Sequence, residues 1–305
     1  TTLTLDGASD VVVTNLVGDI AATGLTGGTL DVTTAENGDD DDITITTGTL
    51  ATSVTGVGTD DTITVNAAAL LNDTTLTLDG ASDVVVTNLV GDIDAKTGDL
   101  TGTLDVTTSD ASDDGISIDL GSASATIDGT AGSDTITVDA DALGDNKLLT
   151  TSGNSSFTVT NLRGDMTNTA VGTVNVTLKD NAFGDVSGWF GRKTLITNDA
   201  STTVTVNNGS FDNNDEIELA GSGNFDVDGV IADVDAALLT GTLDVATVLD
   251  ATDNAVLVTT GNNNTTVSTA AGTDTVTIDA DIMADDKTLT TSGSSDITVT
   301  GLMAD

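Results

Sequence analysis

The stretch TTLTLDGASDVVVTNLVGDI at residues 1–20 recurs without a change at residues 74–93, an offset of 73 residues. Weaker copies begin at Leu148, Glu216 and Thr288. Self-similarity at a fixed period is typical of stacked arrays, in which each repeat buries its core against its neighbours. The copies therefore predict one continuous array over residues 1–305, with units at about 1–73, 74–147, 148–215 and 216–287 and a partial unit at 288–305.

Each unit contains three pieces that read as a strand, a Gly/Asp turn and a second strand, such as TLTL-DGASD-VVVTNL in the first unit. Apolar residues alternate with Thr over four to six positions, which is the period-two signal of half-buried strands. Loosely patterned tails such as VGDIAATGL follow the pieces. The alternation predicts that Ile43, Ile45, Ile63, Val65, Ile136 and Val138 point inward and that Thr44, Thr64 and Thr137 point outward.

This pattern predicts an all-β fold, a right-handed parallel β-solenoid (β-helix). Dividing the 73-residue repeat among three pieces gives coils of about 24 residues, each with three short strands and three corners. Residues n and n + 73 should then superpose after a translation of three coils. Short strands at regular spacing also fit an antiparallel sandwich. The near-identical repeats and the aromatic content of only 2% favour the solenoid and its narrow aliphatic core.

The composition restricts the function. With 49 acidic and 7 basic residues the net charge is −42, which disfavours nucleic acid as a partner and favours cations. Acidic, aromatic-poor chains are often disordered, but the regular alternation favours a folded array. His and Cys are absent, so the commonest general base and the thiol nucleophile are missing. Carboxylate pairs occur at almost every turn and none stands out as catalytic, so we expect no enzymatic activity.

The turns between strands are acidic at equivalent places in successive units. If the coils stack in register, these carboxylates line one edge and repel each other, and Ca²⁺ suits clustered carboxylates and turn carbonyls. Solvated turn aspartates are the alternative reading. The candidate calcium ligands are Asp39, Asp40, Asp41, Asp42, Asp60, Asp61, Asp113, Asp114, Asp134 and Asp274.

One irregular segment, LKDNAFGDVSGWFGRKT at 178–194, carries the only Trp and three of the seven basic residues. It is interpreted either as a contact loop that docks onto an acidic partner or as a plug that fills a widened coil. The candidate contact residues are Trp189, Phe190, Arg192 and Lys193.

GTAGSDTIT at 129–137 is similar to the calcium-binding RTX nonapeptide GGxGxDxUx at Gly129, Gly132, Asp134 and Ile136. RTX sites use such nonapeptides in tandem, whereas each match here stands alone. The whole chain resembles the β-strand-repeat proteins of giant bacterial adhesins, surface layers and hemolysin-type secreted proteins. The resemblance rests on the blocks LVGDIDA, TGTLDVTT and GSDTITVDA at 89–95, 101–108 and 132–140.

The resemblance implies export to the bacterial surface and, with the isolated nonapeptides, calcium as a cofactor. The expected function is that of an extracellular structural repeat protein in a fibre, surface layer or matrix. The alternative is the repetitive stalk of a secreted, calcium-dependent adhesin. Self-association into a filament or layer is the expected partner interaction, a surface or matrix glycan is a further candidate partner, and no run is long enough for a transmembrane segment. The chain begins at a repeat boundary and stops partway through another repeat, which reads as a segment of a longer protein.

Overall fold

A computed structural model describes residues 1–36, 42–59, 61–109, 115–130, 134–179, 193–248, 255–270 and 275–302. Within these ranges the secondary structure consists of strands joined by turns. The described residues include no helix long and apolar enough to cross a membrane.

The chain divides into two compact units, Thr1–Thr158 and Val159–Asp305. The first unit contains β1 (Thr2–Gly7), β2 (Val11–Leu16), β3 (Asp19–Leu25), β4 (Leu30–Thr34), β5 (Asp42–Thr46), β6 (Thr52–Gly56), β7 (Thr62–Asn66), β8 (Thr75–Gly80), β9 (Asp83–Leu89), β10 (Asp92–Asp94), β11 (Leu104–Thr108), β12 (Gly115–Asp119), β13 (Ala125–Gly129), β14 (Thr135–Asp139) and β15 (Leu148–Gly153). The division falls within β16 (Ser156–Leu162).

The second unit contains β17 (Asp165–Asn168), β18 (Val174–Leu178), β19 (Lys193–Asn198), β20 (Thr203–Asn207), β21 (Glu216–Gly221), β22 (Asn224–Val230), β23 (Asp233–Leu239), β24 (Leu243–Thr247), β25 (Ala255–Thr259), β26 (Thr265–Thr269), β27 (Thr275–Asp279), β28 (Leu289–Gly293) and β29 (Asp296–Thr300).

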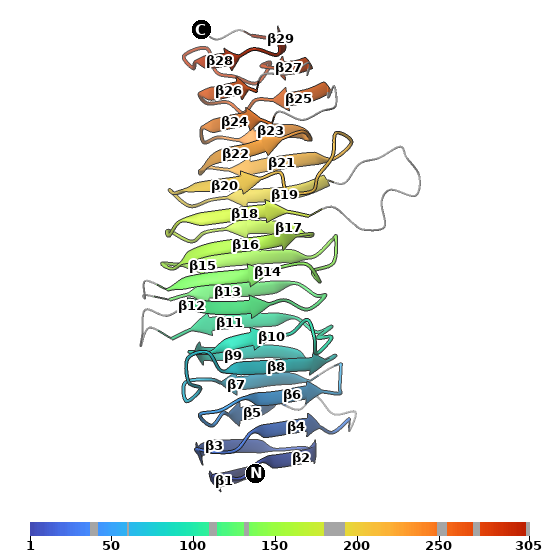
Figure 1. The fold of residues 1–305 in the computed structure, drawn as a ribbon, viewed down its shortest axis with the longest axis vertical. Coiled ribbons are helices and arrows are strands. Elements are labelled where there is room, and N and C mark those ends of the chain that lie inside the picture. Colours follow the sequence, from blue (N-terminus) through green and yellow to red (C-terminus); the bar gives the residue numbers. More distant parts are fainter. Residues whose placement is uncertain are drawn as a thin grey trace. The chain divides into compact units, whose positions relative to one another are not determined.

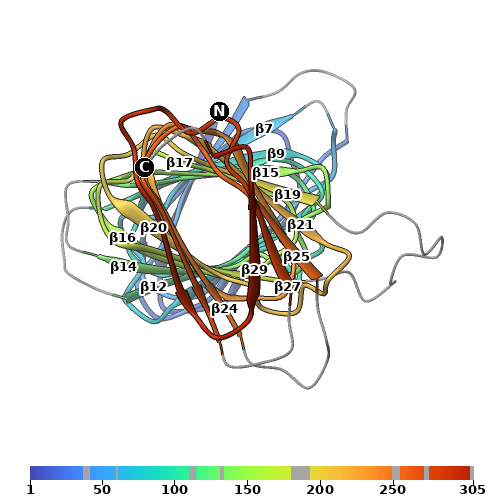
Figure 2. The same ribbon diagram turned by 90° about the horizontal axis from the view of Figure 1, so that it is seen from above.

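Each unit is a parallel β-solenoid, as the sequence predicts, and its strands form two sheets. In the first unit the odd-numbered strands form one sheet and the even-numbered strands form the other, and every named pair of neighbours is parallel (Figure 1). The second unit follows the same rule. A turn holds about 21–24 residues. Seen end-on, β9 and β15 lie on one side of the first unit, and β12 and β14 lie on the other (Figure 2).

The expected three strands per coil are wrong, because each turn crosses two sheets and contains two strands. The tail DIAATGL, which follows the first strand pair, is strand β3, and its Ile20, Ala22 and Leu25 are buried. The alternation of buried and outward residues in β3 is hard to recognise in the sequence, because Ala21, Ala22 and Gly24 are all small. The 73-residue repeat therefore contains seven strands, an odd number, in a fold with two strands per turn.

The expected translation by three coils is also wrong, because seven strands make three and a half turns. The sequence TLTLDG forms β1 in the odd-numbered sheet and β8 in the even-numbered sheet. Equivalent residues of the first two repeats therefore lie on opposite sheets. TLTL and VVVTNL do not form a hairpin, since β1 and β2 belong to different sheets.

The predicted core register is confirmed. Ile43, Ile45, Ile63 and Val65 are buried and lie in register on the neighbouring strands β5 and β7. The threonines between them are exposed or half-buried. Ile136, Val138 and Thr137 follow the same rule in β14.

Two identical hexapeptides show what buries these side chains. Leu76 of β8 is 0% exposed and lies between β6 and β10, whereas Leu3, at the same place in β1, is 43% exposed. β1 pairs with a single strand, β3. Because the two sequences are the same, the difference in burial comes from the neighbouring coils alone.

Replacement of Leu76 by Ala should lower the free energy of unfolding by about 2–5 kcal/mol, the usual loss for a buried Leu. Leu3→Ala, in the same hexapeptide, should have a much smaller effect because its side chain is already partly solvated. Urea denaturation followed by circular dichroism measures both. Equal losses would show that burial between coils does not determine the stability of a strand.

Candidate functional site

Carboxylates at the start of equivalent strands act as acceptors for the backbone of the next coil. In each case the residue directly after the Asp is the first one that pairs with the strand of the next coil. The Asp side chain therefore accepts a hydrogen bond in the place where a backbone carbonyl would accept it farther along the ladder. Oδ1 of Asp19, Asp92, Asp165 and Asp233 accepts the backbone N–H of Thr44 (3.0 Å), Ser117 (2.8 Å), Leu195 (2.9 Å) and Leu257 (2.7 Å), respectively. These four aspartates were not predicted, although a Gly-Asp or Ala-Asp pair before a buried apolar residue marks each of them in the sequence.

A second set of carboxylates is buried at the turns that precede β7, β14 and β21. Asp61 is 4% exposed, Asp134 1% and Asp215 5%. Oδ2 of Asp215 accepts the N–H of Asp212 at 2.8 Å, within its own turn. Oδ2 of Asp61 lies against Gly58, where a larger side chain would have its Cβ, so this carboxylate also folds back onto its own turn. Asp61 is the counterpart of Asp134, because both directly precede a Thr-Ile-Thr-Val strand.

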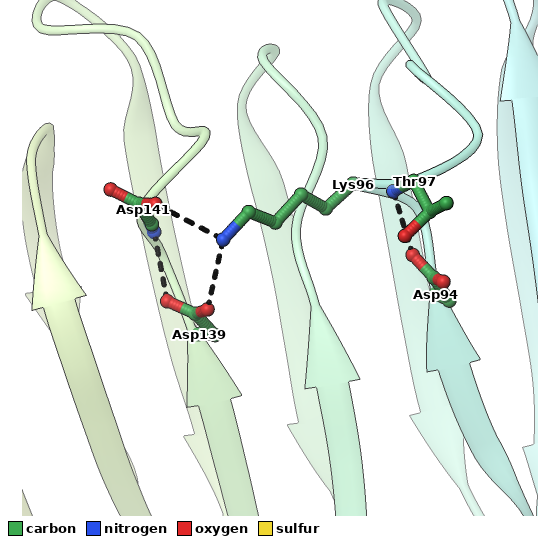
Figure 3. Close-up of polar contacts among 5 residues, drawn as sticks. All are labelled: Asp94, Lys96, Thr97, Asp139 and Asp141. Carbon is green, nitrogen blue, oxygen red and sulfur yellow. Dashed lines mark hydrogen bonds and ion pairs between the residues drawn. The ribbon is translucent and has the colours of Figure 1, made fainter.

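The third set of carboxylates faces outward in register. Asp94, Asp119 and Asp139 lie opposite one another on β10, β12 and β14. Nζ of Lys96 reaches Oδ2 of Asp139 at 3.2 Å and Oδ2 of Asp141 at 3.0 Å, past the intervening coil (Figure 3). The turn that carries Lys96 is held by a 2.8 Å hydrogen bond from the Thr97 N–H to Asp94 Oδ1.

Burial, hydrogen bonds and neighbouring charges shift the pKa values of several of these groups. Burial, followed by the charges of Asp139 and Asp94, raises the pKa of Asp119 above its ordinary value, and Lys96 partly opposes this. The hydrogen bond to Asp141 is the largest cause that raises the pKa of Lys96. In the second unit, burial and then the charges of Asp228 and Asp244 raise the pKa of Asp226.

Lys193, one of the predicted contact residues, binds within the chain. Its Nζ lies 2.8 Å from Glu216 Oε1 and 3.1 Å from Glu218 Oε2, on the neighbouring strand β21. These bonds, first that to Glu216, raise the pKa of Lys193. The ammonium group therefore neutralises two outward carboxylates of the adjacent coil.

Of the other predicted site residues, Asp42 lies within the described ranges and the rest lie outside them. Asp42 is the exposed first residue of β5 and lies opposite Thr62. Within the described ranges no three His, Cys, Asp or Glu side chains are grouped so as to hold a metal ion, and calcium stays a prediction. The residues that lie outside the described ranges are Asp39, Asp40, Asp41, Asp60, Asp113, Asp114, Asp274, Trp189, Phe190 and Arg192.

Comparisons of the chain with protein-family models, curated proteins and solved structures found no match. The chemistry of the site therefore rests on its own geometry. The carboxylates serve as acceptors for the backbone, as buried turn residues, and as outward columns that bind ammonium groups.

Asp165→Ala should remove the acceptor of the half-buried Leu195 N–H and lower the free energy of unfolding by about 1 kcal/mol. Asp165→Asn keeps an acceptor oxygen and should retain most of this stability. Amide hydrogen exchange at Leu195 measures the local effect. Faster exchange of equal size in both variants would mean that the charge, and not the acceptor, protects this amide.

Asp119→Asn should raise the stability at neutral pH. The pKa of Asp119 is raised in the folded state, so its ionised form opposes folding above that pKa, and this opposition disappears as the pH falls toward the ordinary value of 3.8. The gain of the variant over the wild type should therefore shrink across that window. Urea denaturation at a series of pH values measures the gain, and a gain that does not change with pH would contradict the argument.

Proposed function

We propose that this chain is a non-enzymatic, extracellular structural repeat element of a fibre, surface layer or matrix. The observation that carries the proposal is the parallel stacking of coils, in which Leu76 of β8 is buried between β6 and β10. A coil acquires its core only from the coils beside it, and its backbone partners lie in those coils as well. Such an array grows by addition of coils, each advancing the strands by roughly 4.8 Å.

The charge of the chain supports this role. A net charge of −42 keeps an extended surface soluble and repels other copies unless cations intervene. Lateral association of such elements would therefore depend on cations, and Ca²⁺ is the candidate implied by the resemblance to RTX nonapeptides. The resemblance to β-strand-repeat proteins of adhesins keeps the stalk of a calcium-dependent adhesin as the alternative.

Electron microscopy of the purified chain tests the proposal. A fibre or layer element should form regular filaments or sheets with a subunit repeat when Ca²⁺ is added, and it should form fewer at equal ionic strength of Na⁺, which only screens charge. Single particles at every protein and Ca²⁺ concentration would contradict the fibre or layer and favour the stalk. Equal assembly in the two salts would contradict the calcium dependence alone.

A further inference from the structure

In the first, second and fourth repeats, one ladder between neighbouring coils is shorter than the ladder that follows it. Among the described residues, only two pairs are in register between β3 and β5, between β10 and β12, and between β23 and β25. On the other side of β5, β12 and β25, the ladders to β7, β14 and β27 have five pairs each. Backbone pairing is therefore weaker at the two-pair ladders, which we call the short ladders.

In the first and fourth repeats a buried hydroxyl lies beside the short ladder. Thr47 directly follows the last residue of β5 that pairs with β3, and Thr260 directly follows the last residue of β25 that pairs with β23. Both side chains are 0% exposed, and neither Oγ1 has a hydrogen-bond partner within the described part of the chain. Such a hydroxyl opposes the packed state, because it regains its hydrogen bonds with water when the coils separate.

The short ladder of the second repeat has no such hydroxyl and is bridged by a lysine. Leu120 occupies the position of the two threonines and is 0% exposed. Nζ of Lys96, in the turn after β10, reaches Asp139 and Asp141 beyond the coil of β12 (Figure 3). The lysine therefore joins the two sides of the ladder between β10 and β12.

We propose that the solenoid opens locally at the short ladders of the first and fourth repeats, and that Lys96 and Leu120 keep the short ladder of the second repeat closed. Separation at a two-pair ladder breaks fewer backbone hydrogen bonds than separation at a five-pair ladder. Between β3 and β5 and between β23 and β25 it also hydrates a buried hydroxyl, whereas between β10 and β12 it breaks the ion pairs of Lys96. The proposal concerns the stability of the coils and is independent of the structural role proposed above.

Native-state hydrogen exchange of the full chain, followed by NMR at low urea concentrations, tests the proposal. Each strand after a short ladder carries two reporter amides. The N–H groups that donate across the short ladders are those of Thr44, Ser117 and Leu257. The N–H groups that donate across the following five-pair ladders are those of Thr47, Leu120 and Thr260.

The two reporters on a strand should differ in the first and fourth repeats. After correction for intrinsic rates, Thr44 should exchange about tenfold faster than Thr47, and Leu257 about tenfold faster than Thr260, since one unpaired buried hydroxyl corresponds to about that factor. Ser117 should exchange almost as slowly as Leu120 in the second repeat. Fraying of the last strands would give the reverse order in the fourth repeat, with Thr260 faster than Leu257, and would contradict the proposal.

Two variants test the hydroxyls. Thr47→Val removes one hydroxyl with little change of shape and should slow the exchange of Thr44 by about tenfold, without slowing that of Leu257. Thr260→Val should slow Leu257 and not Thr44, so each variant is the matched control of the other. Faster exchange of Thr44 in Thr47→Val would show that the hydroxyl already has a partner, such as a buried water, and would overturn the proposal.

A third variant tests the lysine. Lys96→Met keeps an apolar side chain without the ammonium group and should speed the exchange of Ser117 by about two- to fivefold, the size expected of a partly exposed ion pair. Lys287→Met is the control, because Lys287 pairs with its neighbour Asp286 and crosses no ladder. An unchanged rate at Ser117 in Lys96→Met, or equal exchange of the two reporters in all three repeats, would overturn the proposal.

Discussion

Parallel strands stacked in register place every side chain directly over its counterpart in the next coil. On the inner side this constraint is favourable, because Ile43 lies on Ile63, Ile45 lies on Val65, and the apolar columns exclude water. On the outer side it has the opposite consequence. Once an aspartate occurs at the same place in successive coils, like charges lie one strand spacing apart and repel each other.

The acidic residues of this chain adapt to that constraint in different ways. Some lie where the ladder is interrupted and accept a backbone N–H, as Asp92 does. Others are buried in the turn before a strand, as Asp61 and Asp215 are. The remaining outward columns are partly neutralised by lysine side chains, which reach the adjacent coil in the case of Lys193 and the coil beyond it in the case of Lys96. The acidic side chains are therefore not simply a solvated surface, because some of them accept hydrogen bonds from backbone N–H groups of the next coil.

Much of the fold was predictable, since the alternation of apolar residues with Thr identifies β5, β7 and β14 and their inward side chains. The number of strands per turn was not, because Ala21, Ala22 and Gly24 conceal the strand character of β3. The candidate site was harder to predict. A Gly-Asp or Ala-Asp pair before an apolar residue marks the four backbone acceptors, but the pair alone does not show that the carboxylate accepts an N–H of the next coil. The pairing of Lys96 with Asp139 depends on which coils are neighbours, and the sequence spacing does not reveal it until the register is known.

The odd number of strands in the 73-residue repeat has a genetic consequence. Recombination between identical stretches such as residues 1–20 and 74–93 would remove or duplicate a whole unit. Each such event would add or remove three and a half turns, so every later strand of the first unit would move from one sheet to the other while its core residues stay buried. The stacking survives the change, but each outward group on the downstream strands then faces the opposite side. Adding or removing two units restores the original side. Whether the number of inserted or deleted units is odd or even therefore determines the side that a surface group faces.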